Sequence, residues 1–152
     1  MATAYIGLGS NLGDREAMLR RALALLNGSR GIEVLAVSRF RETEPVGFTD
    51  QPRFVNAVAE LETELEPRPL LEALLGVEQA LGRTREGPRF GPRTIDLDLL
   101  VYEDRVVDEP GLRVPHPRLH ERAFVLEPLA ELRPALIVPG LGPLETLSRN
   151  LE

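Results

Sequence analysis

Two periodicities of the apolar residues divide the chain into strands and helices. Apolar runs and two-residue alternation predict strands at residues 3–10, 32–43, 54–62 and 94–102. Spacings of three and four residues predict helices at 15–27 and 67–82. This order is the β-α-β-β-α-β pattern of a ferredoxin-like α+β fold. We expect both helices to pack on one face of a single sheet, with the other face open for a ligand.

Residues at the element ends support these boundaries. Asp14 precedes the first helix and is a good N-cap, and Gly28 follows its end. Beyond the fourth strand, residues 105–108 suggest a short hairpin arm, and residues 119–132 predict a third helix. We therefore expect a single domain over residues 1–152, in which a strand and helix extension follows the ferredoxin-like core.

Composition narrows the class of protein. The chain of 152 residues is 43% hydrophobic and has no cysteine, which excludes disulfides, thiolate metal sites and thiol nucleophiles. A net charge of −6 argues against a general binder of nucleic acid or of membrane surfaces. No apolar run reaches the roughly 20 residues of a membrane span, and the N-terminus does not resemble a signal peptide. We expect a cytoplasmic protein, and a monomer, without nucleic-acid or membrane partners.

Asp96 and Asp98 are the sharpest chemical signal. Strand alternation directs Ile95, Leu97, Leu99 and Val101 to the core, so the two carboxylates stand side by side on the opposite face. Adjacent carboxylates repel each other unless a cation lies between them. Mg²⁺ takes one or two carboxylates and completes its octahedron with water and substrate phosphates. The alternative is an exposed strand face that merely carries two acids.

An arginine-rich loop directly precedes this carboxylate pair. All 18 basic residues of the chain are arginine, and residues 83–93 hold Arg83, Arg85, Arg89 and Arg93 among glycines and prolines. Guanidinium groups bind phosphates through a planar fork. Together with the carboxylates they indicate a clamp for a triphosphate, although a solvated loop that pairs with nearby Glu is the simpler alternative.

The third predicted strand presents a ring and an amide to the open face. Phe54 and Asn56 lie opposite Val55 and Ala57 in the alternation. A ring for stacking beside an amide for hydrogen bonding suits a flat heterocycle, but Phe54 can equally be sheltered under the following loop. His116 alone proves little, because a single histidine near a loop is more often structural.

Two further features are ambiguous. The glycines of residues 7–13 fit neither the dinucleotide fingerprint nor the Walker loop, so we interpret them as allowing a tight turn with close backbone packing. Glu78 lies beside an apolar helix stripe. It can orient an arginine or lie at the solvent boundary, and we favour the solvent boundary.

Nearly the whole chain resembles the 6-hydroxymethyl-7,8-dihydropterin pyrophosphokinase family of folate biosynthesis. The resemblance is carried by residues 4–13 (AYIGLGSNLG), 43–47 (TEPVG), 51–57 (QPRFVNA), 89–100 (RFGPRTIDLDLL), 114–117 (VPHP) and 122–124 (RAF). It implies transfer of a pyrophosphoryl group from ATP to the hydroxymethyl oxygen of the dihydropterin, with release of AMP. It also implies two Mg²⁺ ions, both bound by Asp96 and Asp98.

The resemblance assigns roles residue by residue. It implies that the pterin lies between Phe54 and Phe124, with its edge bonded by Asn56 and by the loop that contains Thr43, Pro45 and Val46. It implies that the ATP phosphates and ribose face Arg83, Arg85, Arg89, Arg93, His116 and Arg122. Arg83 and Arg93 join Asp96 and Asp98 as the residues expected to carry the catalysis.

Two other classes of protein compete with this enzyme. A non-catalytic ferredoxin-like module can use the same acids and arginines to bind a nucleotide as a regulatory signal. Nucleic-acid binding on the open sheet face would need a basic, aromatic-rich sheet, whereas this chain is acidic and has only seven Phe and Tyr residues. Both rank below the pyrophosphokinase hypothesis.

Overall fold

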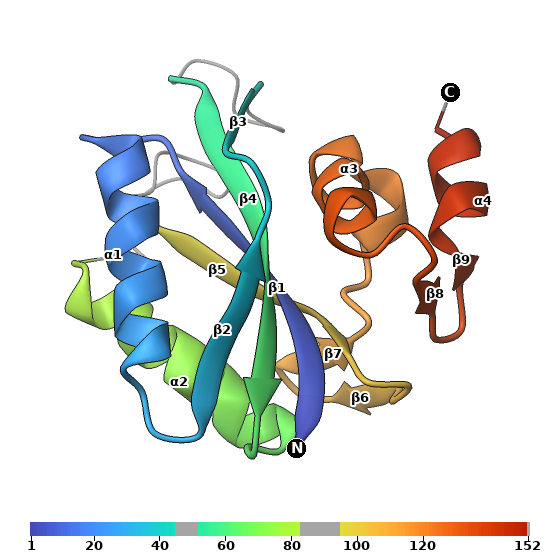
Figure 1. The fold of residues 1–152 in the computed structure, drawn as a ribbon, viewed down its shortest axis with the longest axis horizontal. Helices are drawn as coiled ribbons and strands as arrows, with labels where there is room; N and C mark the ends of the chain where they lie inside the picture. The colour runs from blue at the N-terminus through green and yellow to red at the C-terminus, as the bar shows by residue number, and fades with distance from the viewer. Residues whose placement is uncertain (45–51, 83–94, 152) are drawn as a thin grey trace.

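A computed structural model describes residues 1–44, 52–82 and 95–151 (Figure 1). The strands are β1 (Ala2–Ser10), β2 (Ile32–Val37), β3 (Arg41–Thr43), β4 (Phe54–Thr63), β5 (Asp96–Tyr102), β6 (Val107–Glu109), β7 (Leu112–Val114), β8 (Ile137–Val138) and β9 (Gly142–Pro143). The helices are α1 (Arg15–Asn27), α2 (Pro67–Ala80), α3 (Ala123–Leu132) and α4 (Leu144–Arg149), with a 3-10 turn at Leu119–Glu121.

The main sheet is antiparallel and has the strand order β2-β4-β1-β5, with β3 also paired to β4. The predicted strand at 32–43 is thus divided into β2 and β3. Ser38 causes the break, because its N–H donates to the Val58 carbonyl and its Oγ accepts the Val58 N–H, both at 2.9 Å. A side-chain oxygen therefore replaces a backbone acceptor at this point of the ladder.

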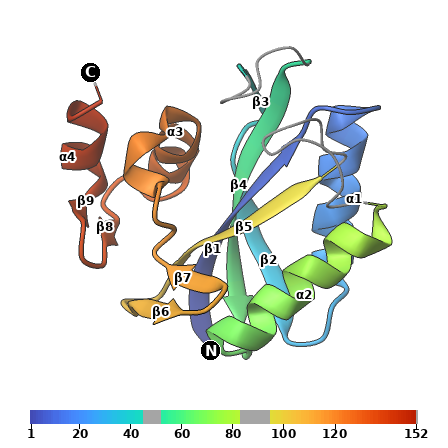
Figure 2. The same cartoon turned by 180° about the vertical axis from the view of Figure 1, so that it is seen from behind.

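Helices α1 and α2 cover one face of the sheet, as the apolar stripes predict (Figures 1 and 2). The core on this side includes Leu19, Leu26, Leu70 and Leu74 from the helices and alternate residues of β1, β4 and β5. The Asp14 side chain caps α1 by accepting the Ala17 N–H at 3.1 Å, so the predicted N-cap is confirmed.

The opposite face is open only in part, so the expectation of a free face is wrong where α3 covers it. Helix α3 packs on that face, and α4 packs against α3 (Figures 1 and 2). They form a second core with Tyr5, Val58, Leu100 and Val101. These apolar side chains would otherwise face water, and the uncovered part of the face is left for a ligand.

A β-bulge explains why Val101 joins this second core rather than the predicted first one. The β1–β5 register shifts between Tyr5 and Ile6. An extra residue in one strand reverses the alternation beyond it. Leu99 therefore lies in the first core, Leu100 and Val101 in the second, and Tyr102 in the first again.

The hairpin arm predicted at 105–108 overlaps β6. This strand pairs with β7, which follows it, and the two form a hairpin. Its turn contains Gly111 at a φ of +75°, a conformation that glycine adopts without strain.

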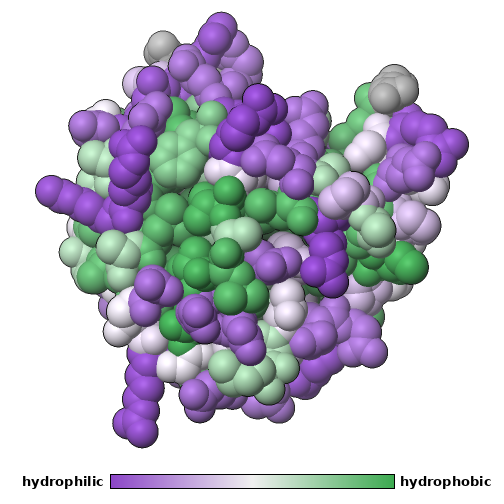
Figure 3. Space-filling view, viewed as in Figure 1, coloured by the Kyte–Doolittle hydropathy of each residue, from purple (hydrophilic) through white to green (hydrophobic). Residues whose placement is uncertain are grey.

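Apolar side chains gather at the centre of the face seen in Figure 3, within a border of polar ones. Leu35 of the edge strand β2 is 46% exposed.

Among the described residues, no helix is long and apolar enough to cross a membrane.

Candidate active site

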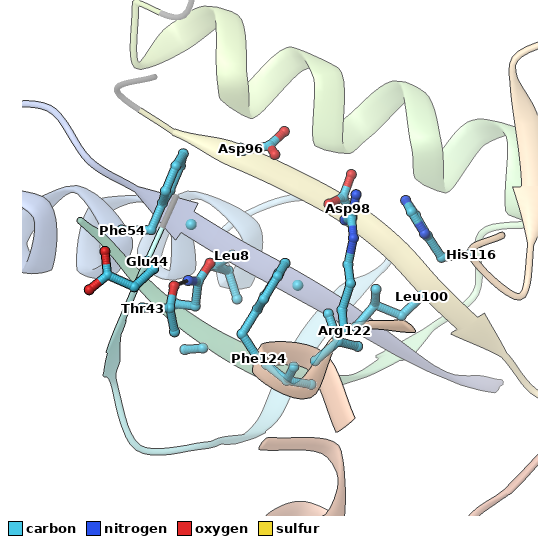
Figure 4. A pocket seen from close by; sticks show the side chains of 16 residues that line it. Leu8, Thr43, Glu44, Phe54, Asp96, Asp98, Leu100, His116, Arg122 and Phe124 are labelled. Atoms are coloured by element: carbon cyan, nitrogen blue, oxygen red, sulfur yellow. Dashed lines mark hydrogen bonds between the residues drawn. The ribbon is translucent and has the colours of Figure 1, made fainter. Parts of the chain in front are cut away.

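A cavity of about 260 Å³ lies on the uncovered part of the sheet, between the strands and the start of α3 (Figure 4). It is lined by residues of β1, β3, β4 and β5 and, beyond the sheet, by His116, Arg122, Phe124 and Val125. Its lining includes eight residues that the sequence singled out: Thr43, Phe54, Asn56, Asp96, Asp98, His116, Arg122 and Phe124. The structure thus brings together side chains from four segments that are distant in the sequence, while their individual roles stay predictions.

Two phenyl rings form the walls of one end of the cavity. Phe54 begins β4 and Phe124 lies in the first turn of α3, and Figure 4 shows both rings standing over β1 with a gap between them. Asn56 is 9% exposed, and its Nδ2 donates to the Thr43 Oγ1. A flat polar molecule could lie between the rings and meet the amide with its edge.

Gly7 and Gly9 line the cavity from β1, where they lie within a regular strand. The tight turn that we expected among the glycines of residues 7–13 lies beyond the strand, where Gly13 has a φ of +66°, and the expected close packing is found at Gly9. A Cβ on Gly9 would lie 2.7 Å from the Asn56 Oδ1, which is too close for any real side chain. A glycine inside a strand commonly marks a close approach of another group. Here that group is the Asn56 amide.

Asp96 and Asp98 point to the same side of β5, as predicted, and both are half-buried (Figure 4). They are opposite Gly9 and Gly7 in the β1–β5 ladder. The described residues hold no cluster of three or more His, Cys, Asp or Glu side chains suited to a metal. A pair of carboxylates fits Mg²⁺ nevertheless, because this ion fills its remaining positions with water and phosphate oxygens.

His116 and Arg122 complete the charged side of the cavity. Burial lowers the pKa of His116 to about 4, with a further contribution from the Arg122 guanidinium. Its Nδ1 accepts the Arg118 N–H at 3.2 Å, so the proton of the neutral ring lies on Nε2. The Arg122 guanidinium lies 5.5 Å from the centre of the Phe124 ring. Both side chains can donate hydrogen bonds to an anion.

A second cavity of about 420 Å³ adjoins the first, and sequence analysis did not predict it. Asp98 and His116 line both cavities. The other lining residues come from α2, β5, the β6–β7 hairpin and the segment that follows it: Leu71, Leu97, Leu99, Gly111, Leu112, Arg113 and Pro117. Asp98 therefore lies where two cavities meet, one with aromatic walls and one lined by leucines together with Asp98, Arg113 and His116.

Glu78 is the residue that sequence analysis misplaced most clearly. It is 3% exposed, and its Oε2 accepts the Leu97 N–H at 2.7 Å. The solvent boundary that we favoured is therefore wrong. Its position one helical turn after Leu74, on the buried stripe, was the available signal.

Six predicted site residues lie outside the described residues. These are Arg83, Arg85, Arg89 and Arg93 of the arginine-rich loop, and Pro45 and Val46. Their roles stay predictions. The described residues on either side of 45–51 make polar contacts. Asn11 Nδ2 donates to the Pro52 carbonyl at 3.0 Å, and Arg53 forms an ion pair with Glu44 at 2.7 Å.

These features define a class of protein: a mixed α/β fold with an antiparallel sheet, a pair of carboxylates on its open face and two adjoining cavities of small-molecule size.

Comparison with known proteins specifies the family. The family model described as 7,8-dihydro-6-hydroxymethylpterin-pyrophosphokinase (HPPK) matches residues 5–134, and the chain belongs to this family. It is 52% identical over 129 residues to a 2-amino-4-hydroxy-6-hydroxymethyldihydropteridine pyrophosphokinase from Bacillus subtilis, a match that covers 85% of this chain and 77% of that one. A protein of the same name from Methylorubrum extorquens is 49% identical over 149 residues, with coverage of 98% and 94%. The chain is thus a diphosphotransferase of folate biosynthesis, as the sequence resemblance implied.

Solved structures share the fold at low sequence identity. An HPPK-DHPS in complex with substrates matches with a TM-score of 0.75 at 11% identity, over 98% of this chain and 43% of that one. The Plasmodium falciparum HPPK-DHPS with pteroate gives a TM-score of 0.77 at 13% identity, over 98% and 42%. The chain spans less than half the length of these two structures, which support the mixed α/β fold.

Proposed function

We propose that the protein transfers the terminal pyrophosphoryl group of ATP to the hydroxymethyl oxygen of 6-hydroxymethyl-7,8-dihydropterin. The oxygen forms a bond to the β-phosphorus while the bond from that phosphorus to the α,β-bridging oxygen breaks, and AMP leaves. The observation that carries the proposal is that Asp96 and Asp98 line one cavity together, and that Asp98 also lines the adjoining one. Family membership supports the choice of both substrates.

The cavity with aromatic walls is the proposed pterin site. A pterin is flat and carries donors and acceptors on its edge, so it would stack between Phe54 and Phe124. Asn56 and Thr43 would form hydrogen bonds with that edge. The two side chains lie next to each other in the cavity lining and are hydrogen-bonded to one another. We place Pro45 and Val46 beside them on the basis of the sequence resemblance alone.

The second cavity is the proposed nucleoside site. Its aliphatic lining suits a base and a ribose, and the shared residues Asp98 and His116 lie where a triphosphate would cross to the first cavity. Arg122 and the Nε2–H of His116 would donate to phosphate oxygens. Arg83, Arg85, Arg89 and Arg93 are proposed to complete the clamp, with Arg83 and Arg93 opposing the charge that develops during transfer.

Asp96 and Asp98 are proposed to hold two Mg²⁺ ions. When bound, these ions would neutralise phosphate charge and hold the phosphate chain in one geometry. The chain's own contribution is positioning. The two rings fix the pterin, the carboxylates fix the phosphate end, and the rigid sheet fixes the distance between them.

We also propose that the core of the domain has the ferredoxin-like topology that the sequence predicted. The antiparallel strand order β2-β4-β1-β5 supports it, with α1 and α2 on one face and the C-terminal extension on the other. A single domain over residues 1–152, the monomeric state and the cytoplasmic location stay predictions.

The direct test mixes the protein with ATP, MgCl₂ and 6-hydroxymethyl-7,8-dihydropterin and separates the nucleotides. We expect AMP to appear in step with the pterin diphosphate, and only when Mg²⁺ is present. Asp96→Asn should lower turnover by orders of magnitude, whereas Asp104→Asn, at an exposed residue that lines neither cavity, should not. ADP as product would refute the pyrophosphoryl step. Binding of both substrates without turnover would favour the regulatory module.

A further inference from the structure

Glu78 is buried at a place where a carboxylate is costly. It lies on the apolar stripe of α2, among Leu70, Leu74 and Val77, and is 3% exposed. Among the described residues, it is the single acidic or basic residue that is buried. A buried carboxylate is retained in a fold when specific hydrogen bonds satisfy it.

The Glu78 carboxylate accepts a hydrogen bond from the backbone of β5. Its Oε2 accepts the Leu97 N–H at 2.7 Å, a length typical of a charge-assisted bond. β5 is an edge strand of the sheet in the described part of the chain, where it pairs with β1. In an antiparallel ladder, successive N–H groups point alternately toward and away from the partner strand. The Leu97 N–H points away from β1, and Glu78 supplies the acceptor that a further strand would have supplied.

This contact lies at the centre of the carboxylate pair. Leu97 separates Asp96 from Asp98, and its own side chain is buried in the core shared with α2. The peptide that carries the Leu97 N–H joins Asp96 to Leu97, so a shift of this peptide turns Asp96 directly and Asp98 through the next residue. Groups that hold metal ligands in place commonly contribute ten- to a hundredfold to metal affinity or activity.

We propose that Glu78 is a positioning residue that holds Asp96 and Asp98 in the geometry that binds the metal–nucleotide complex. It acts through the Leu97 N–H, from the side of the sheet opposite the cavity with aromatic walls. The proposal rests on the metal and nucleotide sites of the proposed function.

Two variants separate position from charge. Glu78→Gln keeps an acceptor oxygen at the same reach and loses the charge, whereas Glu78→Asp keeps the charge and is one methylene too short. We expect Glu78→Gln to bind Mg²⁺ with α,β-methylene ATP within about threefold of wild type in calorimetry. Glu78→Asp should bind at least tenfold more weakly. Should Glu78→Asp fail to fold, Glu78→Leu takes its place.

Hydrogen exchange of the Leu97 amide in metal-free protein gives a second readout. It should be as slow in Glu78→Gln as in wild type and faster in Glu78→Asp. The matched control is Glu60→Asp. The Glu60 side chain is 16% exposed, and its Oε1 accepts the Tyr5 hydroxyl at 2.6 Å, away from the carboxylate pair. It should lower stability without changing nucleotide binding.

Three outcomes overturn the proposal: Glu78→Asp with wild-type affinity, folded Glu78→Gln with the affinity of Glu78→Asp, or an unchanged exchange rate in Glu78→Asp. Asp96→Asn, measured in parallel, tests the underlying site. If Asp96→Asn binds the metal–nucleotide complex like wild type, the metal assignment itself is wrong. If Asp96→Asn loses binding while Glu78→Asp does not, only the role of Glu78 is wrong.

Discussion

Gly9→Ala tests the geometry of the proposed pterin site with a single methyl group. The new Cβ would lie 2.7 Å from the Asn56 Oδ1 and 3.6 Å from the Phe54 Cδ1. The second distance is an ordinary contact, but the first is not, so the Asn56 amide must rotate or shift. That movement breaks its hydrogen bond to Thr43 and withdraws it from the cavity edge.

The magnitude follows from the lost polar contact. A buried polar group that loses its partner costs about 1–3 kcal/mol. At about 1.4 kcal/mol for each factor of ten, pterin affinity should fall by roughly 5- to 150-fold. The strand itself should tolerate alanine, because Gly9 is not among the glycines with positive φ. The free energy of unfolding should fall by about 0.5–1.5 kcal/mol, which is the net cost of the lost hydrogen bond between Asn56 and Thr43.

The assay is calorimetric or fluorescence titration with 6-hydroxymethyl-7,8-dihydropterin, together with the NMR signals of the Asn56 side-chain amide. Gly7→Ala is the matched control, since its Cβ would meet Leu100 at an ordinary 3.6 Å. It should leave the Asn56 signals near their wild-type positions. Wild-type pterin affinity in Gly9→Ala, with displaced Asn56 signals, would refute the role of this amide. Undisplaced signals would refute the steric argument.

Two further predictions concern the cap of α1 and the titration of His116. Asp14→Ala should lower the free energy of unfolding by about 1 kcal/mol, because the Ala17 N–H loses its acceptor. Thermal melting should show the loss, Asp14→Asn should restore most of it, and equal melting of all three proteins would contradict the cap. His116 has its pKa lowered from 6.5 to about 4, so between these pH values the unfolded chain binds more protons than the folded one. Its contribution to stability should rise as pH increases from about 4 to about 6.5, and a ring-proton NMR titration with a midpoint at or above 6.5 would contradict the burial argument.

Much of the site could be predicted because side-chain alternation along a strand is a local property. Phe54 and Asn56 share one face of β4, and Asp96 and Asp98 share one face of β5, as the sequence indicated. Consecutive side chains point to opposite sides of any extended backbone, whatever strand lies beside it. The caps and apolar stripes of the helices were readable for the same reason.

The errors fall where one segment depends on another that is distant in the sequence. Val101 changes core because of a bulge between β1 and β5, and the break at Ser38 depends on the backbone of Val58. The buried position of Glu78 depends on α2 packing against β5. Nothing in the local pattern around these residues indicates which group they will meet.

The sequence by itself therefore determined the order of the main elements, the face on which strand residues lie where the strand is regular, and the chemistry available to the site. The tertiary structure decided which part of the sheet stays open, which strands lie side by side and how two cavities meet at Asp98. The physical reason is the range of each effect. Backbone geometry acts between neighbouring residues, whereas strand register, helix docking and the approach of Gly9 to Asn56 exist only after segments far apart in the chain have packed together.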